Sequence, residues 1–336
     1  MLKLKRYKNN LILKPDPKNW WEKAAVFNCA AWYDGKLIHL LYRAIGEYVR
    51  YTSRLGYAVS KDGFHFLKTS NLPVFEPKEN YEKEACEDPR LMFLEGKLYM
   101  TYVAHFRHPR EGKEPAHTAL ALIENQSFKE FERLGIITPK GSDNRDVVLF
   151  SEKIDKKFVM LHRPFRWTRK WLKEMKTSEE KPWLPCLIRD LPEKPSIWIA
   201  SSSNLKEWTG YKIVMEPKEK WESSKIGVGP PPIRISEGWI LIYHGVDENK
   251  VYRAGIALLD LQDPSRVIAR LPYPVLEPEE EYEKKGDVPD VVFPEGTIVK
   301  DGMLFVYYGG ADKVCCLATV KISDLLEELK KFNIKN

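Results

Sequence analysis

The chain has 336 residues, of which 43% are hydrophobic, so it is long and apolar enough to bury a sizeable core. It contains no run of about 18 apolar residues, which argues against a membrane-spanning helix, and residues 1–6 lack the apolar stretch of a secretion signal. The net charge is +6, but Lys and Glu are interspersed along the chain. The charge therefore predicts a solvated surface rather than a nucleic-acid-binding patch, and we expect neither nucleic acid nor a membrane as a partner.

The number and spacing of the cysteines argue against disulfide bonds and against a structural metal site. Their number is odd and no two are spaced as CxxC; they are Cys29, Cys86, Cys186, Cys315 and Cys316. This usage is typical of reduced thiols rather than of a disulfide framework or a zinc site. We therefore expect a cytoplasmic protein without a structural metal.

A strand repeat runs along the chain. Five times, polar or small residues lead into an apolar run, at residues 27–31, 87–93, 144–150, 227–233 and 289–293. Second apolar runs follow at 37–42, 98–103, 158–162, 239–244 and 304–308, and third runs at 55–59, 118–123, 197–201, 254–259 and 315–320. A period of roughly 60 residues built only of short strands indicates a propeller. We predict an all-β, five-bladed β-propeller that occupies residues 1–336 as one domain.

Turns and the two ends of the chain support this prediction. Asp34-Gly35, Glu95-Gly96 and Asp301-Gly302 stand between first and second strands, as hairpin turns do. Fourth strands or their approaches are expected at residues 64–66, 128–131, 205–208 and 267–271. A short C-terminal helix is expected at about residues 323–332, with Ser323 as its N-cap. The last blade then lacks an outer strand, which the N-terminal segment is predicted to supply.

The third copy carries an insertion of about residues 164–195, which contains Trp167, Trp171 and Trp183. A functional interpretation is a lid whose aromatic rings stack on a sugar, because the C–H faces of sugars are apolar. A folded surface loop explains the same residues.

Glu87-Asp88-Pro89-Arg90 places two acids on an otherwise apolar strand. Such acids cost desolvation energy unless they are paired or face a pocket, and Pro89 fits the first residues of a strand. In a propeller the first strand of each blade lines the central axis, so Asp88 is expected to face an axial pocket. The alternative is an Asp–Arg pair that only closes the blade.

Four side chains that can carry positive charge stand at equivalent strand ends: Arg145, Arg163, Lys225 and His244. They would repel one another unless an anion lies between them, and Arg and Lys are the usual phosphate-binding residues. The alternative is a set of separate salt bridges to acids such as Asp146, Asp290 and Asp312. Weaker candidates at the same rim are Asn28, Arg43, Arg54, Tyr252 and Asp312. Gly227-Val228-Gly229 precedes three prolines and no helix, so it is not a dinucleotide fingerprint.

Together these motifs resemble glycoside hydrolase family 130, the mannoside phosphorylases. The resemblance runs from about Asn28 to Asp312. It is carried by Glu87-Asp88-Pro89-Arg90, residues 144–150, Leu161-His162-Arg163-Pro164, residues 225–232, Tyr243-His244-Gly245-Val246, Tyr252-Arg253-Ala254-Gly255, residues 258–261 with Asp263-Pro264, and residues 307–312. It implies a five-bladed β-propeller, in agreement with the repeat.

The resemblance also implies a chemistry. Family members invert at the anomeric carbon with inorganic phosphate as nucleophile, and no metal or organic cofactor is implied. By this resemblance Asp88 is the general acid, whose proton passes through a sugar hydroxyl. The phosphate-binding residues are then Arg145, Arg163, Lys225, His244 and Tyr252. The sugar-binding residues are Asn28, Arg43, Arg54, Asp146 and Asp312.

The expected function is therefore phosphorolysis of a terminal β-mannoside to α-mannose 1-phosphate, with a β-1,4-linked mannoside or mannosyl-glucose favoured. Some family members are hydrolases that lack much of the cationic set, so its presence favours a phosphorylase. The alternatives are a β-mannosidase, a β-1,2-mannoside phosphorylase and a non-catalytic carbohydrate-binding propeller. Glu87 stands where some members carry an aromatic residue, which leaves the linkage open. The partners expected are a β-mannoside oligosaccharide and phosphate, and a homo-oligomer is plausible.

Overall fold

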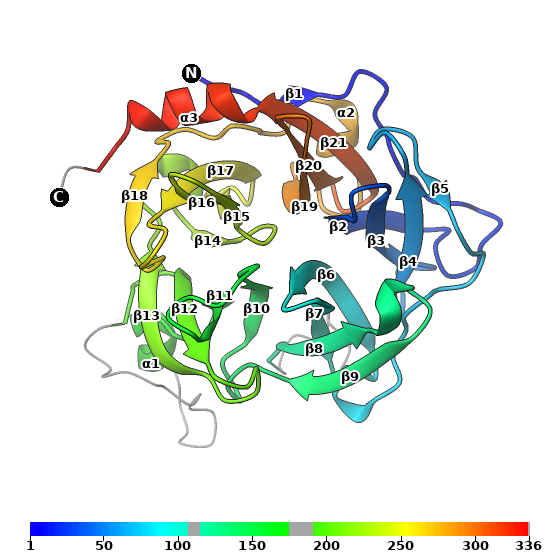
Figure 1. Ribbon diagram of the computed structural model, residues 1–336. Helices are drawn as coiled ribbons and strands as arrows, with labels where there is room; N and C mark the ends of the chain where they lie inside the picture. The colour runs from blue at the N-terminus through cyan, green and yellow to red at the C-terminus, as the bar shows by residue number, and fades with distance from the viewer. Residues whose placement is uncertain (107–114, 175–190, 335–336) are drawn as a thin grey trace.

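The fold is a ring of antiparallel sheets around a central axis (Figure 1). The computed structural model describes residues 1–106, 115–174 and 191–334. Five sheets follow one another around the ring, each with its first strand innermost. The predicted all-β, five-bladed propeller is confirmed.

The blades follow the order of the repeat. Blade 1 consists of β2 (Ala25–Tyr33), β3 (Ile38–Ile45), β4 (Ser53–Ser60) and β5 (Leu67–Lys68). Blade 2 consists of β6 (Ala85–Leu94), β7 (Lys97–His105), β8 (His117–Ile123) and β9 (Phe131–Ile136). Blade 3 consists of β10 (Asn144–Leu149), β11 (Phe158–Pro164), β12 (Ile197–Ser202) and β13 (Thr209–Met215). Blade 4 consists of β14 (Lys225–Val228), β15 (Ile233–Ile235), β16 (Gly238–Val246), β17 (Tyr252–Leu259) and β18 (Val267–Arg270). Blade 5 consists of β19 (Val292–Lys300), β20 (Met303–Gly310), β21 (Val314–Lys321) and β1 (Lys5–Arg6).

Helices are few and short in the described part of the chain. They are α1 (Arg169–Glu174), α2 (Glu281–Lys284) and α3 (Ile322–Lys330), with 3-10 turns at Asn80–Glu82, Glu124–Gln126 and Lys220–Glu222. The C-terminal helix is confirmed, but its cap is Lys321 rather than Ser323, because the chain leaves β21 directly into the helix. Leu325 and Leu329 share one face of α3 and are buried. No helix among the described residues is long and apolar enough to cross a membrane.

The hydrophobic core is divided into five layers, one between each pair of neighbouring blades. Successive side chains of a strand point to opposite faces of its sheet, so every blade contributes to two layers. Between blades 5 and 1, for example, Phe305 and Leu317 pack with Leu40 and Val26. Equivalent clusters lie between the other four pairs of blades. This packing holds the inner strands around the axis.

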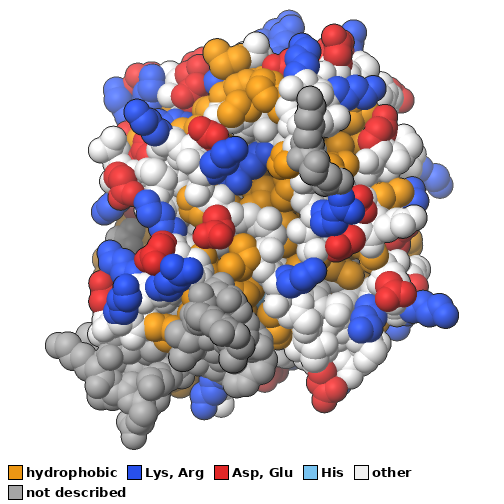
Figure 2. Space-filling view, turned by 90° about the vertical axis from the view of Figure 1, so that its left-hand side faces the viewer, with side chains coloured by type: hydrophobic (Ala, Val, Ile, Leu, Met, Phe, Trp, Pro, Cys, Tyr) orange, Lys and Arg blue, Asp and Glu red, His pale blue; other side chains and the backbone are white. Residues whose placement is uncertain are grey.

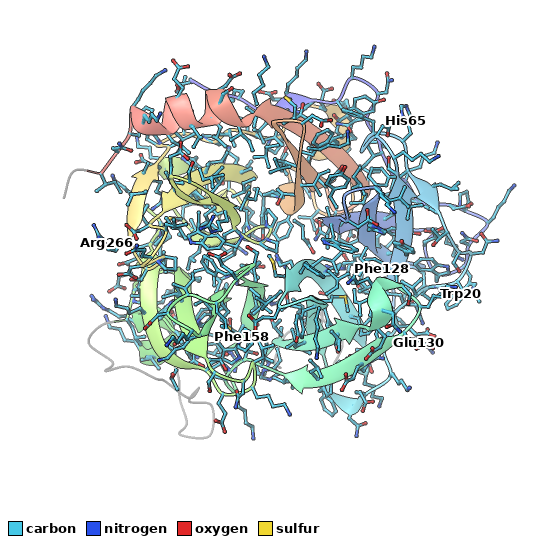
Figure 3. The ribbon with its side chains drawn as sticks, in the orientation of Figure 1. Trp20, His65, Phe128, Glu130, Phe158 and Arg266 are labelled. Carbon is cyan, nitrogen blue, oxygen red and sulfur yellow. The ribbon has the colours of Figure 1, made fainter. Side chains whose placement is uncertain are left out.

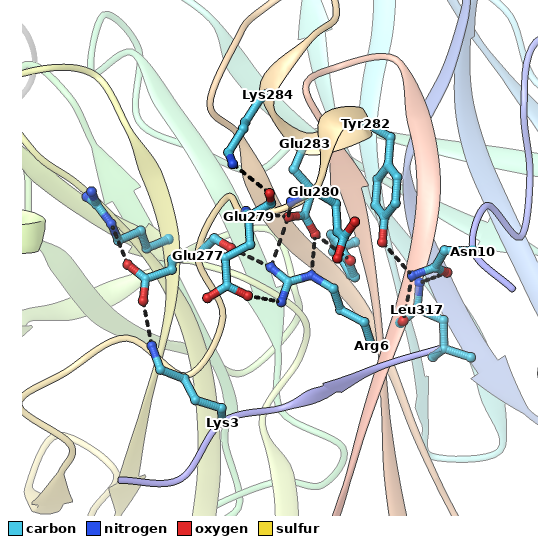
Figure 4. Close-up of polar contacts among 12 residues, drawn as sticks. Lys3, Arg6, Asn10, Glu277, Glu279, Glu280, Tyr282, Glu283, Lys284 and Leu317 are labelled. Atoms are coloured by element: carbon cyan, nitrogen blue, oxygen red, sulfur yellow. Dashed lines mark hydrogen bonds and ion pairs between the residues drawn. The ribbon is translucent and has the colours of Figure 1, made fainter. Parts of the chain in front are cut away.

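The N-terminal segment closes the ring, as predicted. β1 pairs with β21 and so becomes the outer strand of blade 5. Arg6 then reaches α2 and the residues before it, where it donates to the Glu283 carboxylate at 2.8 and 2.9 Å and to Glu279 at 2.6 Å (Figure 4). The two ends of the chain are thus joined by both sheet hydrogen bonds and charge.

A second repeat, which the sequence analysis missed, holds four of the blades together internally. Each of these blades has a fully buried Glu just before its inner strand, a Tyr on its second strand and a cation on its outer strand. The sets are Glu22, Tyr42 and Lys68; Glu82, Tyr102 and Arg133; Glu222, Tyr243 and Arg270; and Glu283, Tyr308 and Arg6. We call each set a blade tie. The signal for it was available, because an aromatic residue precedes the Glu every time, as in Trp21-Glu22 and Tyr81-Glu82.

Charged residues of both signs lie on the face of the molecule shown in Figure 2. Lys and Arg side chains are interspersed there with Asp and Glu. This distribution matches the solvated surface expected from the sequence. The predicted fourth strands or their approaches are confirmed: Val267–Arg270 forms β18, and residues 64–66, 128–131 and 205–208 lead into β5, β9 and β13.

Candidate active site

A polar cavity of about 290 Å³ lies on the propeller axis. All five blades contribute to its lining, and ten of the eleven predicted site residues are found there. They are Asn28, Arg43, Asp88, Arg145, Asp146, Arg163, Lys225, His244, Tyr252 and Asp312. Residues separated by up to 284 positions in sequence (312 − 28) therefore meet in one site.

Three of these residues are presented by β-bulges. Asn28, Asp88 and Asp146 each lie where the pairing of an inner strand shifts register, and their φ angles are 45°, 49° and 56°. Asn and Asp tolerate this left-handed region better than most residues. A bulge re-aims the side chain that it carries. The polar residues that looked misplaced on apolar strands are thus the ones the bulges direct to the axis.

Asp88 is held through one of its two carboxylate oxygens. Arg43 Nη1 donates to Oδ1 at 2.8 Å, and Asn28 Nδ2 donates to the same atom at 2.9 Å. No described residue donates to Oδ2, although Asp88 lines the cavity. The second oxygen is therefore the one that can carry a proton toward a ligand.

Glu87 fixes the arginine that holds Asp88. Arg43 Nη2 donates to Glu87 Oε1 at 2.6 Å, Ser53 donates to the same oxygen, and His105 lies 3.1 Å from the other. Burial would raise the pKa of Glu87, but the charge of Arg43 and the contact with His105 outweigh burial and hold the pKa below its usual range. Glu87 is thus an anion that lines the cavity while Arg43, Ser53 and His105 contact its carboxylate.

The cations gather around the neighbouring part of the cavity. Arg163 donates twice to Asp146 Oδ2, at 2.7 and 2.9 Å, while Arg145 contacts Asp143 at 3.2 Å. Lys225 Nζ donates to the Tyr252 hydroxyl at 2.8 Å. The alternative of separate salt bridges therefore describes Arg163 and Arg145, but no carboxylate within ion-pair distance neutralises Lys225 among the described residues.

His244 is neutral rather than a fourth cation. Burial lowers its pKa to about 3, because the nearby Arg163 and Lys225 add to desolvation and Asp146 only partly opposes them. Neither ring nitrogen has a hydrogen-bond partner in the described part of the chain. The imidazole can therefore donate one hydrogen bond and accept another from a ligand.

Asp146 was predicted to bind sugar, but its carboxylate is directed to the cations. Besides Arg163, it contacts Arg90 Nη2 at 3.4 Å and lies 3.7 Å from His244 Nε2. Those positive charges outweigh burial and lower the pKa of Asp146. Asp146 thus orients the cationic side of the cavity, and both its oxygens are occupied there.

Two glycines make the site possible sterically. A Cβ atom at Gly227 would overlap Asp146 Oδ2 and lie within 2.6 Å of the His244 ring. A Cβ atom at Gly309 would overlap Asn28 Oδ1. Gly227, which the sequence analysis discounted as a nucleotide motif, is therefore needed because the backbone of β14 passes directly against the side chains of Asp146 and His244.

The comparisons with known proteins agree with this geometry. A family model described as β-1,4-mannooligosaccharide phosphorylase matches residues 7–331. The chain belongs to glycoside hydrolase family 130. It is 41% identical to a 1,2-β-oligomannan phosphorylase of Thermoanaerobacter sp. (strain X514), over 97% of this chain and 99% of the relative. It is 38% identical to a β-1,2-mannobiose phosphorylase of the same organism, over 96% and 98%. The crystal structure of the Listeria innocua β-1,2-mannobiose phosphorylase, in complex with β-1,2-mannobiose, has a TM-score of 0.79 at 27% identity and covers 98% of this chain and 100% of its own.

Arg54 is the one predicted residue that this family 130 chain does not bring to the cavity. Its Nε contacts Glu76 at 3.2 Å, and its guanidinium stacks on Trp20, which lies at the outer rim of the ring (Figure 3). The reason is strand alternation. Ser53, one residue earlier, contacts Arg43 and Glu87, so Arg54 points away from them.

Trp167, in the insertion of blade 3, does not belong to a lid as the functional interpretation of the sequence expected. That side chain is fully buried and packs edge-on against Trp198, so it belongs to the core. Trp171 lies on α1 and lines a second cavity of about 840 Å³, which shares Lys225 and Tyr252 with the axial one. Trp183 lies outside the described residues.

The sequence analysis missed three polar groups of the family 130 site. Glu87, Tyr51 and Asp287 line the cavity, and the Tyr51 hydroxyl donates to Asp287 at 2.6 Å. Tyr51 lies in the loop between β3 and β4, and Asp287 lies in the loop before β19. Their place next to strand ends at the rim of the cavity was the signal that could have identified them. Among the described residues no cluster of three or more His, Cys, Asp or Glu side chains could hold a metal ion.

The pKa of Asp312 is raised, whereas the pKa values of the lining carboxyls Glu87 and Asp146 are lowered. Burial, together with the negative charges of Asp88 and Asp287, raises the pKa of Asp312 to about 7, although Arg43 acts in the opposite direction. Its backbone is left-handed, with φ 49°. Near neutral pH Asp312 can therefore either donate or accept a hydrogen bond.

Proposed function

We propose that the protein is an inverting β-1,2-mannoside phosphorylase, which cleaves a terminal mannosyl residue with inorganic phosphate and gives α-mannose 1-phosphate. One observation carries the reaction type. The same axial cavity holds Asp88, one of whose carboxylate oxygens has no donor among the described residues, and the basic side chains of Arg145, Arg163 and Lys225.

Phosphate chemistry explains why this set of residues suffices. Inverting hydrolysis needs a second carboxylate to deprotonate water, whereas phosphate arrives as an anion and needs cations instead. A phosphate oxygen forms a bond to the anomeric carbon as the glycosidic C–O bond breaks. The leaving oxygen takes the proton of Asp88, which in this family passes through a sugar hydroxyl. Arg and Lys neutralise the phosphate with charge-assisted hydrogen bonds, and neutral His244 and Tyr252 add uncharged donors.

The linkage is proposed from the relatives. Three relatives at 41, 38 and 34% identity are named for β-1,2-linked mannosides, whereas those named for β-1,4-mannooligosaccharide and 4-O-β-mannosyl-glucose are 31 and 28% identical. This ordering favours β-1,2 over the β-1,4 linkage expected from the sequence. Asn28, Arg43 and Asp312 are proposed to bind the hydroxyls of the mannosyl residue that is transferred.

The deciding experiment incubates the purified protein with β-1,2- and β-1,4-linked mannobiose and mannotriose, with and without phosphate, and quantifies mannose 1-phosphate and free mannose. Phosphate-dependent mannose 1-phosphate from the β-1,2 substrates is expected. The same product from only the β-1,4 substrates would correct the linkage. Free mannose formed equally without phosphate would identify a hydrolase, and a family 130 structure described as targeting β-1,2 linkages by hydrolysis is a neighbour at TM-score 0.76 and 26% identity. An Asp88→Asn preparation controls for contaminating activity.

A further inference from the structure

Glu295 is a buried carboxyl group that neither the acid nor the phosphate site accounts for. It lies in β19 at a fourth inner-strand bulge, where the pairing shifts register between Pro294 and Gly296. Its side chain is fully buried, and it is not part of the cavity lining. Neither carboxyl oxygen has a hydrogen-bond partner within the described ranges.

The nearest charge is the guanidinium of Arg90, whose Nη1 lies 4.0 Å from Glu295 Oε1. Arg90 reaches from blade 2 to blade 4 and is only 2% exposed. Its Nε donates to the Gly229 carbonyl at 2.8 Å, and Nη1 donates to the Asp88 carbonyl at 2.9 Å. It also contacts Asp146 at 3.4 Å. Arg90 therefore connects the backbone of Asp88 to Gly229 of blade 4 and to the Asp146 carboxylate.

Glu295 has the environment of an uncharged acid. A buried carboxylate without hydrogen bonds is very costly, and such groups usually take up a proton instead. The groups that face it are Asp88 and Arg90 from β6, Cys29 from β2 and Arg43 from β3. Burial and the charge of Asp88 raise the pKa of Glu295 well above its ordinary value, despite the two arginines.

We propose that Glu295 is a positioning residue for Asp88: as an uncharged polar group beside Arg90, it keeps the guanidinium on the Asp88 carbonyl, and so maintains the left-handed backbone that presents the acid to the cavity. A charged carboxylate at this distance would attract Arg90 away from its carbonyl partners. An apolar side chain would leave the guanidinium without a polar neighbour on that side. The proposal rests on the proposed role of Asp88 as the acid.

The test compares Glu295→Gln, which keeps shape and polarity without charge, with Glu295→Ala and Glu295→Leu. Glu295→Gln is expected to keep kcat within about twofold and to leave the pH profile unchanged. Both apolar variants are expected to lower kcat by about 10- to 100-fold, the effect of a small misplacement of a catalytic group, while the phosphate KM changes by less than about twofold. The Leu variant preserves volume in case the Ala variant does not fold.

Glu222→Gln is the matched control, because Glu222 is equally buried but lies in the tie of blade 4. It is expected to lower Tm without changing kcat or the pH profile. A loss of more than about tenfold in kcat for Glu295→Gln, or a full wild-type kcat in both apolar variants, would overturn the proposal. So would an infrared difference spectrum, wild type minus Glu295→Gln at neutral pH, without a protonated-acid band. The spectrum does not depend on enzyme activity, so it tests the protonation of Glu295 even if the wild-type protein shows no phosphorolysis.

Discussion

Asp88 has a backbone conformation that only its surroundings maintain. Its φ of 49° is uncommon for a residue other than glycine, and it is held by Pro89 on one side and by the Arg90 contact to its carbonyl. Arg43 and Asn28 both donate to Oδ1 of its carboxylate and not to Oδ2. The backbone and Oδ1 are thus fixed by protein contacts, which leaves Oδ2 for the proposed acid role.

Asp88→Asn tests that role. The amide keeps an oxygen for Arg43 and Asn28 but has no acidic proton, so kcat is expected to fall by about 10²- to 10⁴-fold, with the mannoside Kd within about threefold. Calorimetric titration of the mannoside and initial rates of mannose 1-phosphate release check both values. Turnover at more than about a tenth of the wild-type rate would remove Asp88 from the acid role.

Lys225→Met tests the phosphate site. Lys225 lacks a neutralising carboxylate among the described residues and contacts only Tyr252, so its charge is available to an anion. Loss of a hydrogen bond to a charged group is worth about 1.5–3 kcal/mol, so the phosphate KM is expected to rise by about 10- to 150-fold, with the mannoside KM nearly unchanged. Lys153→Met, which removes an exposed ion pair with Glu95, is the control. Equal phosphate KM values for the two variants would contradict the assignment.

The raised pKa of Asp312 predicts that the stability of the fold depends on pH. Its folded-state pKa is raised to about 7 from an ordinary 3.8, so the folded protein binds this proton more tightly than the unfolded chain does. The stability that this supplies is complete below about pH 4 and is lost as pH rises through 7. Asp312→Asn is therefore expected to exceed wild type in Tm by a margin that grows from pH 4 to 7 and then levels off. Asp301→Asn, at an exposed turn with φ 51°, is the control, and a margin independent of pH would exclude the raised pKa.

At the level of strands, the limits of sequence prediction have one physical cause. Apolar runs reveal where strands lie, and a period of two residues assigns their faces. A bulge adds one residue and reverses the faces beyond it. Asn28 and Asp88 were assigned correctly because the polar residue itself marks the bulge. Arg54 was assigned to the wrong face, because β4 is regular and nothing in its sequence distinguishes its two faces.

The blade ties are the elements that set stability without touching the site. In blade 2, Tyr102 and Arg133 both donate to the fully buried Glu82. Tyr102→Phe removes one donor to a buried charge, a loss of about 1.5–3 kcal/mol, which for a chain of this length corresponds to about 2–4 °C in Tm. Tyr33→Phe, which removes an exposed bond to the Gly35 carbonyl, is expected to change Tm by less than about 1 °C. Thermal unfolding followed by circular dichroism compares them, and equal shifts would exclude the tie as a stabilising element.

For the whole molecule, the repeat predicted the number of blades, the closure of the ring and the convergence of distant residues on one axis. Charge states were less predictable. His244 was counted as a cation, but its burial makes it neutral. Asp146 was expected to face the sugar, but its Oδ2 accepts from Arg163 and its Oδ1 contacts Arg90. Both depend on how far each side chain lies from water and from its neighbours. A sequence does not state those distances until the blades are assembled.

Closure of the ring depends on β1, which has only two residues. Two backbone pairs are too few to hold a strand, so its side-chain contacts are expected to carry the closure. Arg6 supplies them, because it is bidentate to the fully buried Glu283, a carboxylate that also accepts from the Tyr308 hydroxyl. Lys3, in the same segment, makes only an exposed ion pair with Glu277.

Arg6→Gln is therefore expected to destabilise the whole ring, because it leaves the buried Glu283 without its cation. Removal of one partner of such a pair costs about 3 kcal/mol, or about 4 °C in Tm, whereas Lys3→Gln is expected to cost less than about 1 kcal/mol.

Burial opposes ionisation of Glu283, but the hydrogen bonds from Arg6 and two backbone amides lower the pKa of Glu283 below its ordinary 4.5. This contribution is therefore present above about pH 4.5 and is lost as pH falls through the lowered pKa, so the Tm difference between wild type and Arg6→Gln is expected to narrow in acid. Thermal unfolding of both variants at pH 7 and pH 3 measures it, and a loss from Lys3→Gln as large as that from Arg6→Gln would show that closure does not depend on Glu283.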